Sequence, residues 1–177
     1  MAANIEFKAR LQDVASAHAI AKRLSGKGPE ILRQCDVFFA SPRGRLKLRI
    51  FDEDEAAAAR GELILYERSD QPGPRRSNYQ IASTPDPLVL RQILEQMLGS
   101  FGTVRKVRSL YLAGQSRIHL DKVEGLGDFL EIEVVLREGQ PDAEGEQIAQ
   151  FLMQEFGIQE CDLVPLAYID LLSAGQK

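Results

Sequence analysis

Four segments of this chain alternate between charged and apolar residues. In residues 5–11, Ile-Glu-Phe-Lys-Ala-Arg-Leu, every even position is charged and every odd position is apolar, and residues 45–50, 117–121 and 130–134 follow a similar pattern. Alternation with period two predicts β-strands that have one polar and one buried apolar face. The polar faces are unusual because they carry Lys, Arg, Asp and Glu, with few Ser, Thr or Gln.

The full pattern predicts eight strands separated by turn residues. They are expected at residues 4–11, 36–40, 45–51, 62–68, 76–82, 103–112, 115–121 and 129–136. The short links Ser41-Pro42-Arg43-Gly44 and Ala113-Gly114 are typical of hairpins, so the strands on either side of each link are expected to be antiparallel.

Four helices are expected between and after these strands. The first spans residues 14–24 with Asp13 as its N-cap, and the second spans residues 87–98 with Pro at its first position. The third runs from residue 142 to 156, and the last is a short apolar helix at residues 164–173.

An antiparallel sheet of eight strands is too large to lie flat, so it is expected to curl or close. The predicted fold class is therefore α+β, with a closed or nearly closed eight-stranded antiparallel β-barrel that forms a tunnel. The charged strand faces would point into this tunnel, and the flanking helices would cover the apolar outer faces. The 177 residues are expected to form a single domain over residues 1–177.

The composition and net charge argue against two classes of function, membrane binding and nucleic-acid binding. The chain is 44% hydrophobic, yet no stretch approaches the roughly 20 apolar residues of a membrane span, and the N-terminus runs straight into a strand. We therefore expect a cytoplasmic protein that does not bind membranes. The net charge of −4 argues against a dedicated nucleic-acid binder. Exposed apolar outer faces make a homodimer reasonable.

Clustered carboxylates are the first candidate chemistry. Glu131 and Glu133 lie two residues apart on one strand, so both point to the same side about 6.6 Å apart along it. Asp121 ends the preceding strand, and Glu6 adds a fourth carboxylate. Acids gathered in one enclosed site need protonation, basic partners or a hard cation such as Mg²⁺ or Mn²⁺. The alternative is a solvated face with ordinary ion pairs.

Basic residues are the second candidate chemistry, because they are concentrated on the predicted strands rather than on the helices. Guanidinium groups bind phosphate oxygens in bidentate fashion, and Lys supplies a compact positive charge. His119 points to the same side as Arg117 and Asp121, where it could bind a ligand or pair with an acid. The basic strand residues are Lys8, Arg10, Arg45, Lys47, Arg49, Arg68, Lys106, Arg108 and Arg117.

The segment Asn4-Ile5-Glu6-Phe7-Lys8 resembles the N-terminal ExExK motif of the CYTH superfamily, also called triphosphate tunnel metalloenzymes. That superfamily includes class IV adenylyl cyclases, thiamine triphosphatases and inorganic tripolyphosphatases. The resemblance continues in order almost to the end of the chain, through residues 34–39, 46–49, 65–68, 106–108, 119–127, 131–133 and 168–172.

The resemblance implies an eight-stranded antiparallel tunnel that holds a triphosphate together with one or two Mg²⁺ or Mn²⁺ ions. It also implies that Lys8 assists proton removal from the attacking oxygen. The implied phosphate ligands are Lys8, Lys47, Arg49, Arg68, Lys106 and Arg108. The implied ligands of the metal or of its waters are Glu6, Asp121, Glu131 and Glu133.

One position departs from the motif, because Asn4 stands where the family has its first Glu. In the family, the N-terminal acids help to hold a second metal, which prepares the attacking water in hydrolytic members. A missing negative charge is expected to weaken that site, which favours cyclisation over hydrolysis.

The first hypothesis is therefore a metal-dependent enzyme of the class IV adenylyl cyclase type, which converts ATP to cyclic AMP and pyrophosphate. The second is a triphosphatase that acts on thiamine triphosphate, inorganic tripolyphosphate or a nucleotide. The third is a non-catalytic triphosphate sensor. A fourth interpretation, a barrel whose internal charges only pair with one another, predicts no triphosphate binding.

Overall fold

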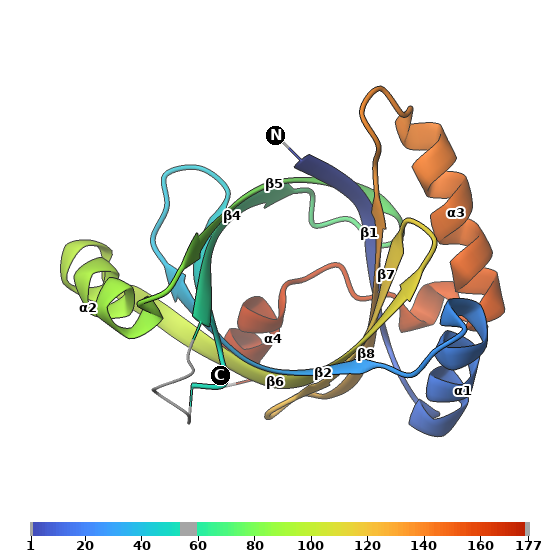
Figure 1. The fold of residues 1–177 in the computed structure, drawn as a ribbon, viewed down its shortest axis with the longest axis horizontal. Coiled ribbons are helices and arrows are strands. Elements are labelled where there is room, and N and C mark those ends of the chain that lie inside the picture. The colour runs from blue at the N-terminus through green and yellow to red at the C-terminus, as the bar shows by residue number, and fades with distance from the viewer. Residues whose placement is uncertain (1, 54–59, 176–177) are drawn as a thin grey trace.

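The protein forms a closed eight-stranded antiparallel β-barrel in a computed structural model that describes residues 2–53 and 60–175 (Figure 1). The strands are β1 (Ala2–Arg10), β2 (Glu30–Phe39), β3 (Arg45–Phe51), β4 (Arg60–Arg68), β5 (Arg75–Thr84), β6 (Ser100–Ala113), β7 (Ser116–Val123) and β8 (Gly127–Val135). Around the barrel their order is β1-β5-β4-β3-β2-β6-β7-β8, and every neighbouring pair is antiparallel. The predicted fold class is confirmed.

Four α-helices surround the barrel: α1 (Val14–Ser25), α2 (Pro87–Leu98), α3 (Asp142–Glu155) and α4 (Tyr168–Ala174). Figure 1 shows α1 and α3 on one side, α2 on the opposite side, and α4 at the end of the barrel that faces away from the viewer. The predicted cap of α1 is confirmed, because the Asp13 side chain accepts a hydrogen bond from the Ser16 backbone N–H.

Most of the hydrophobic core lies outside the barrel, between its outer face and the helices, and the part around α4 also includes the inward-facing Phe38 and Val104. Ile5, Phe7 and Ile132 are fully buried in the same cluster as residues of α1 and α3. A second cluster joins the outer face of β2 and β3 to α2, and a third surrounds α4. Apolar burial on the outside of the sheet leaves the polar strand faces to line the inside.

The last helix is shorter than the sequence predicts. Residues 164–167, expected to be helical, are not, and α4 begins only at Tyr168. The chain ahead of it pairs with the end of β1: Leu163 forms a bridge with Ala9, and the Val164 N–H donates to the Lys8 carbonyl at 2.8 Å. Pro165 also disfavours a helical conformation for the residue before it. Tertiary pairing therefore overrides the apolar pattern here.

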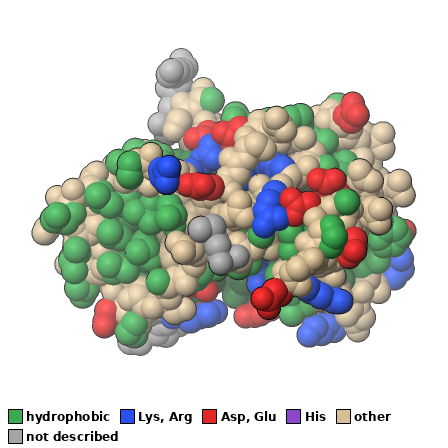
Figure 2. Space-filling view, turned by 90° about the horizontal axis from the view of Figure 1, so that it is seen from above, with side chains coloured by type: hydrophobic (Ala, Val, Ile, Leu, Met, Phe, Trp, Pro, Cys, Tyr) green, Lys and Arg blue, Asp and Glu red, His purple; other side chains and the backbone are tan. Residues whose placement is uncertain are grey.

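Apolar side chains gather on the side of the molecule that carries α2 (Figure 2). Val89, Ile93 and Met97 of this helix, spaced four residues apart, are 57%, 52% and 75% exposed. Among the described residues, no helix has both the length and the apolar character needed to cross a membrane.

Gly145 is required where α3 packs against the barrel. A Cβ atom at this position would lie 2.7 Å from both Ile5 Cγ1 and Leu136 Cδ2. Overpacking of this kind typically costs about 1–3 kcal/mol, more than the roughly 1 kcal/mol that Ala gains over Gly in a helix. We expect Gly145→Ala to lower the free energy of unfolding by about 1–2 kcal/mol in a urea titration. Gln147→Ala, at an exposed position of the same helix, is the control and should change it by less than about 0.5 kcal/mol; equal stability of the two variants would contradict the packing argument.

Candidate functional site

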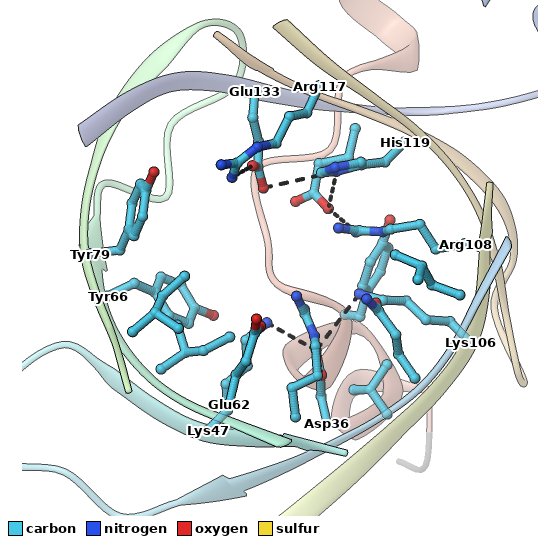
Figure 3. Close-up of a pocket in the computed structure, with 18 of the residues that line it drawn as sticks. Asp36, Lys47, Glu62, Tyr66, Tyr79, Lys106, Arg108, Arg117, His119 and Glu133 are labelled. Atoms are coloured by element: carbon cyan, nitrogen blue, oxygen red, sulfur yellow. Dashed lines mark hydrogen bonds and ion pairs between the residues drawn. The ribbon is translucent and has the colours of Figure 1, made fainter. Parts of the chain in front are cut away.

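The barrel encloses a cavity of about 370 Å³ that is lined by inward-facing residues of all eight strands (Figure 3). This volume is within the range of small-molecule sites. All six predicted phosphate ligands line it, as do three of the four predicted metal ligands. The basic lining residues are Lys8, Lys47, Arg49, Arg60, Arg68, Lys106, Arg108 and Arg117. The acidic ones are Glu6, Glu30, Asp36, Glu62, Glu131 and Glu133.

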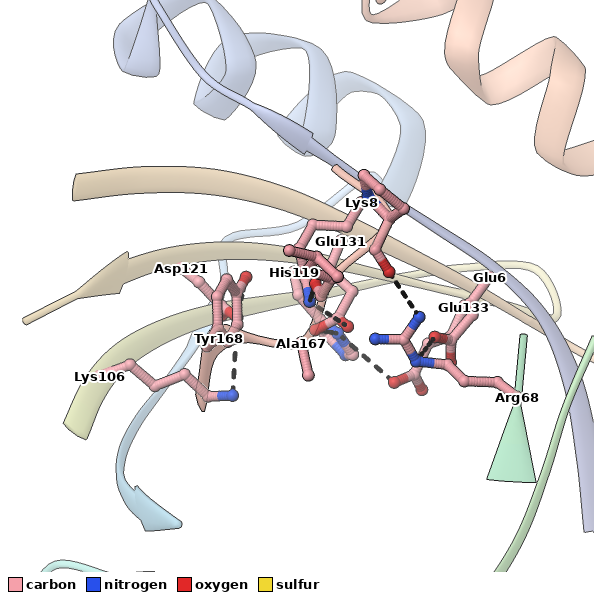
Figure 4. Close-up of polar contacts among 12 residues, drawn as sticks. Glu6, Lys8, Arg68, Lys106, His119, Asp121, Glu131, Glu133, Ala167 and Tyr168 are labelled. Carbon is pink, nitrogen blue, oxygen red and sulfur yellow. Dashed lines mark hydrogen bonds and ion pairs between the residues drawn. The ribbon is translucent and has the colours of Figure 1, made fainter. Parts of the chain in front are cut away.

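One end of the tunnel is closed by α4 and the segment that precedes it, residues 163–167. Tyr168 lines the cavity, and its ring lies under the Lys8 ammonium, with Nζ 3.9 Å from the ring centroid (Figure 4). Lys8 Nζ also donates to the Leu166 carbonyl at 3.4 Å, and Arg68 Nη1 donates to the Pro165 carbonyl at 3.0 Å. The closing segment therefore fixes two of the predicted phosphate ligands.

Asp36 of β2 gathers three of the basic side chains. Arg49 donates to it from Nε and Nη2 at 2.8 and 2.9 Å, Lys47 Nζ lies at 2.9 Å, and Lys106 Nζ lies 3.7 Å away. Burial by itself raises the pKa of Asp36, but these three cations outweigh it and hold the pKa well below its usual range. Asp36 was not among the predicted site residues, although it faces inward between two strands that carry basic residues.

Asp121 lies beside the cavity rather than in its lining. Arg108 donates to both of its carboxylate oxygens at 2.6 Å, and the Tyr168 hydroxyl donates to one of them at 3.1 Å. Burial raises the pKa of Asp121, yet Arg108 and Lys106 outweigh it and lower the pKa to about 2. Arg108 Nη2 also donates to Glu131 at 2.6 Å, so the structure links Asp121 to Glu131 through a shared Arg, and its role as a metal ligand stays a prediction.

Glu131, Glu133 and His119 form a group that could hold a cation. One ligand atom from each lies within 4.8 Å of the others, and His119 Nδ1 is 4.0 Å from Glu131 and 3.9 Å from Glu133. Burial, reinforced by Arg108, lowers the pKa of His119 to about 4, so the imidazole is neutral near pH 7. His119 Nδ1 is buried and has no hydrogen-bond partner among the described residues. Two carboxylates and a neutral imidazole form a donor set that suits Mn²⁺.

Glu6 lies opposite Glu133 in the register of β1 and β8, but its carboxylate has basic partners of its own. Its carboxylate lies 3.2 Å from Arg68 Nε and 3.9 Å from Arg75 Nη2. Burial, with Glu131 adding to the effect, raises the pKa of Glu6 to about 7. Arg75 was not predicted as a site residue, because the fifth strand was expected to begin at residue 76. Its position opposite Glu6 depends on the strand register, which the sequence pattern does not give.

The sequence matches a known protein family. A family model described as the CYTH domain matches residues 2–168. The chain belongs to the CYTH family. This confirms the resemblance drawn from the ordered motifs. Among curated proteins, no match was found.

Several solved structures share this CYTH fold. PH1012 from Pyrococcus horikoshii is 25% identical with a TM-score of 0.81, covering 95% of this chain and 98% of its own. An adenylate cyclase candidate from Vibrio parahaemolyticus is 20% identical with a TM-score of 0.78, covering 96% and 97%. The adenylyl cyclase candidate HpAC1 from Hippeastrum, described as having a dominant triphosphatase activity, is 17% identical with a TM-score of 0.67, covering 97% and 96%.

The departure from the CYTH N-terminal motif lies inside the tunnel. Asn4 is 3% exposed and lines the cavity two residues before Glu6 on β1. Its Oδ1 atom is buried and has no hydrogen-bond partner among residues 2–53 and 60–175. An amide oxygen without a partner can accept a hydrogen bond from a ligand, but it supplies no negative charge.

Asp36 should be essential for the stability of the tunnel. Asp36→Asn removes the charge that compensates three buried cations, and breaking a buried ion pair typically costs about 3–5 kcal/mol. We expect a loss of this size in the free energy of unfolding, measured by urea titration at pH 7. Asp52→Asn, at an exposed position just beyond β3, is the matched control. A loss below about 1 kcal/mol at position 36 would show that the cluster is not compensated in this way.

Glu6 should make the stability depend on pH. Its pKa is raised in the fold, so its contribution is complete below the unfolded pKa and is lost as the pH rises through about 7. Glu6→Gln removes this loss. We expect the free energy of unfolding of Glu6→Gln relative to wild type to increase by about 1–3 kcal/mol between pH 5 and pH 8. Glu138→Gln, at an exposed position, should show a constant difference; a constant difference for both variants would contradict the raised pKa.

Proposed function

We propose that the tunnel binds a triphosphate together with a divalent metal ion and that the protein catalyses a reaction of this triphosphate. The observation that carries the proposal is the set of buried cations that the internal acids do not satisfy. Lys106 is 6% exposed, yet its nearest carboxylate oxygens lie 3.7 Å away and it makes no hydrogen bond within the described residues. Lys8 Nζ lies 3.8 Å from Glu131, and its one hydrogen bond within the described residues goes to the neutral Leu166 carbonyl at 3.4 Å. A barrel built only for internal ion pairs would leave fewer of its buried ammonium groups at such distances.

Electrostatics also favour an anion in the cavity. Basic groups outnumber acidic ones in the lining, and the raised pKa of Glu6 reduces the negative charge further. Burial, reinforced by Arg108, lowers the pKa of Lys106 to about 7. An entering polyanion would favour its protonated form, so anion binding is expected to draw in a proton.

The residues divide into two groups by role. Glu131 and Glu133, with His119, are the side chains that would hold Mg²⁺ or Mn²⁺, and the cation would supply positive charge that stabilises the leaving group. Arg49, Lys106 and Arg108 would neutralise charge on the phosphates from the facing walls.

Lys8 is the candidate base. Burial lowers its pKa, although Glu131 opposes the shift, so a neutral amine that can take a proton becomes more accessible. Its position between the Tyr168 ring and Glu131 holds the ammonium at the closed end of the cavity.

Cyclisation of a nucleoside triphosphate of the class IV adenylyl cyclase type is the first reaction we propose. Two observations support it: Asn4 contributes no charge, and Glu6 is already paired with Arg68 and Arg75. Both weaken a second cation site of the kind that prepares water for hydrolysis. An adenylate cyclase candidate with the same fold is consistent with this proposal.

Hydrolysis is the second candidate. It is favoured by the triphosphatase activity described for the similarly folded HpAC1. A sensor without turnover is the third. A panel of ATP, thiamine triphosphate and inorganic tripolyphosphate with Mg²⁺ and with Mn²⁺, analysed by phosphorus NMR, distinguishes these reactions. Cyclic AMP with pyrophosphate indicates the cyclase, release of orthophosphate the hydrolase, and binding without turnover the sensor. Absence of triphosphate binding would refute the proposal as a whole.

Cytoplasmic location, the absence of a nucleic-acid partner and a homodimer are further parts of the proposal. The exposed apolar residues of α2 offer a surface for the homodimer, which light scattering of the purified chain can test.

Glu131 gives the sharpest test of the metal role. Glu131→Gln keeps an oxygen that can accept the hydrogen bond from Arg108 but removes the charge that a cation needs. We expect metal-dependent turnover to fall at least about 100-fold, with the far-ultraviolet circular dichroism unchanged. Glu138→Gln is the control and should retain wild-type activity. Wild-type turnover in Glu131→Gln would remove Glu131 from the site.

A further inference from the structure

The tunnel wall formed by β4 and β5 differs in chemistry from the opposite wall. Its centre consists of four uncharged side chains, and the strand register pairs Tyr66 with Tyr79 and Ile64 with Ile81. We call these four residues the β4–β5 wall. The residues of β5 that line the cavity, Ser77, Tyr79 and Ile81, are all uncharged, and the charged residue of the same row, Arg75, lies beside Glu6 instead.

The β4–β5 wall faces the ionic side of the cavity. Figure 3 shows Tyr66 and Tyr79 pointing into the cavity from one side, while Arg108, His119 and Arg117 point into it from the other. A ligand that fills the space between them therefore meets charges on one side and aromatic and aliphatic surface on the other. Inorganic tripolyphosphate has no group suited to the second surface.

This wall runs from the closed end, where Tyr66 packs against the cluster around α4, toward the open end at Ile81. Arg68 lies at the closed end, where it binds the Pro165 carbonyl, and Ile81 is 47% exposed. Along β4, Glu62 is six residues from Arg68, or about 20 Å at 3.4 Å per residue. A triphosphate held by the deep cations would thus carry its attached group along the β4–β5 wall toward Glu62.

Glu62 is a carboxylate without a partner at the outer edge of this wall. It is half-buried and lines the cavity, yet within the described part of the chain it forms no hydrogen bond and no ion pair within 4 Å. Its register neighbour on β3 is Arg49, whose guanidinium is already bound to Asp36 through two nitrogens. Glu62 is therefore free to accept a hydrogen bond from a ligand.

We propose that the β4–β5 wall and Glu62 form a subsite for a planar heteroaromatic group that bears an amine, with the aromatic and aliphatic side chains packing against the ring and Glu62 accepting from the amine. Adenine and an aminopyrimidine both have this chemistry. The inference rests on the proposed triphosphate function and adds that the substrate is an organic triphosphate rather than inorganic tripolyphosphate. A polar group that finds its matched partner gives more discrimination than apolar contact alone.

Calorimetric titrations in EDTA, which prevents metal-dependent turnover, test this subsite. The probes are ATP, thiamine triphosphate, purine riboside triphosphate and inorganic tripolyphosphate; the purine riboside compound is ATP without its amine. The variant is Glu62→Ala. Its matched control is Glu67→Ala on the same strand, where Glu67 is exposed and does not line the cavity. Glu62→Gln is the second variant, should Glu62→Ala fail to fold.

We expect ATP or thiamine triphosphate to bind wild type at least about tenfold more tightly than tripolyphosphate, and the preferred one identifies the ring. Glu62→Ala should lose about tenfold in affinity for that ligand and leave tripolyphosphate binding unchanged or stronger. If ATP is preferred, purine riboside triphosphate should bind wild type as weakly as ATP binds Glu62→Ala. Glu67→Ala should match wild type, and Glu62→Gln should show a smaller loss in the same direction.

Wild type that prefers tripolyphosphate, or a Glu62→Ala variant that keeps the wild-type preference, would overturn the subsite while leaving the triphosphate function intact. Absence of binding by all four probes would instead refute the proposed function on which the subsite rests.

Discussion

The ion-pair cluster around Asp36 is the interaction on which the tunnel depends. In a closed barrel every second residue of a strand points inward, so a cation placed there cannot turn away to solvent. Like charges about 4 Å apart repel each other by about 4 kcal/mol near a protein surface, and by more where water is excluded. The barrel order β3-β2-β6 places Asp36 between the strands that carry Lys47, Arg49 and Lys106, so one carboxylate compensates all three.

The acids do not fully compensate the buried cations, and the remaining positive charge favours binding of an anion in the cavity. Arg49 and Arg108 are held by short bidentate contacts, whereas Lys8 and Lys106 lie against the Tyr168 ring at longer distances from acids. Groups held in place before a ligand arrives lose little free energy to reorganisation when it binds. The closing segment contributes to this order through its carbonyl groups, so α4 is part of the site as well as a cover for the barrel.

Much of this could be predicted from the sequence, because alternation is a local property. The strand pattern placed Lys47, Arg49 and Lys106 on inward faces, and all six phosphate ligands implied by the family resemblance line the cavity. Partners across strands could not be predicted, since they depend on register. The bidentate pair of Arg108 with Asp121 and the contact of Arg75 with Glu6 both come from neighbouring strands. The start of α4 was wrong for the same reason, because pairing of residues 163–164 with β1 is a long-range effect.

The strand register also places charged and uncharged side chains on different walls of the cavity. On β1, Asn4 is neutral and burial raises the pKa of Glu6 to about 7, whereas on β8 cations such as Arg108 outweigh burial and lower the pKa of Glu131 and Glu133, so the negative charge that attracts a divalent cation concentrates on these two. The uncharged side chains of β4 and β5 lie across the cavity from His119 on β7 (Figure 3), whereas β8 is separated from β5 by β1. A bound metal and the organic end of a substrate would therefore contact different walls of the tunnel, with the phosphates over the deep cations. Such an arrangement lets the organic subsite change without disturbing the charge balance that the barrel needs in order to stay folded.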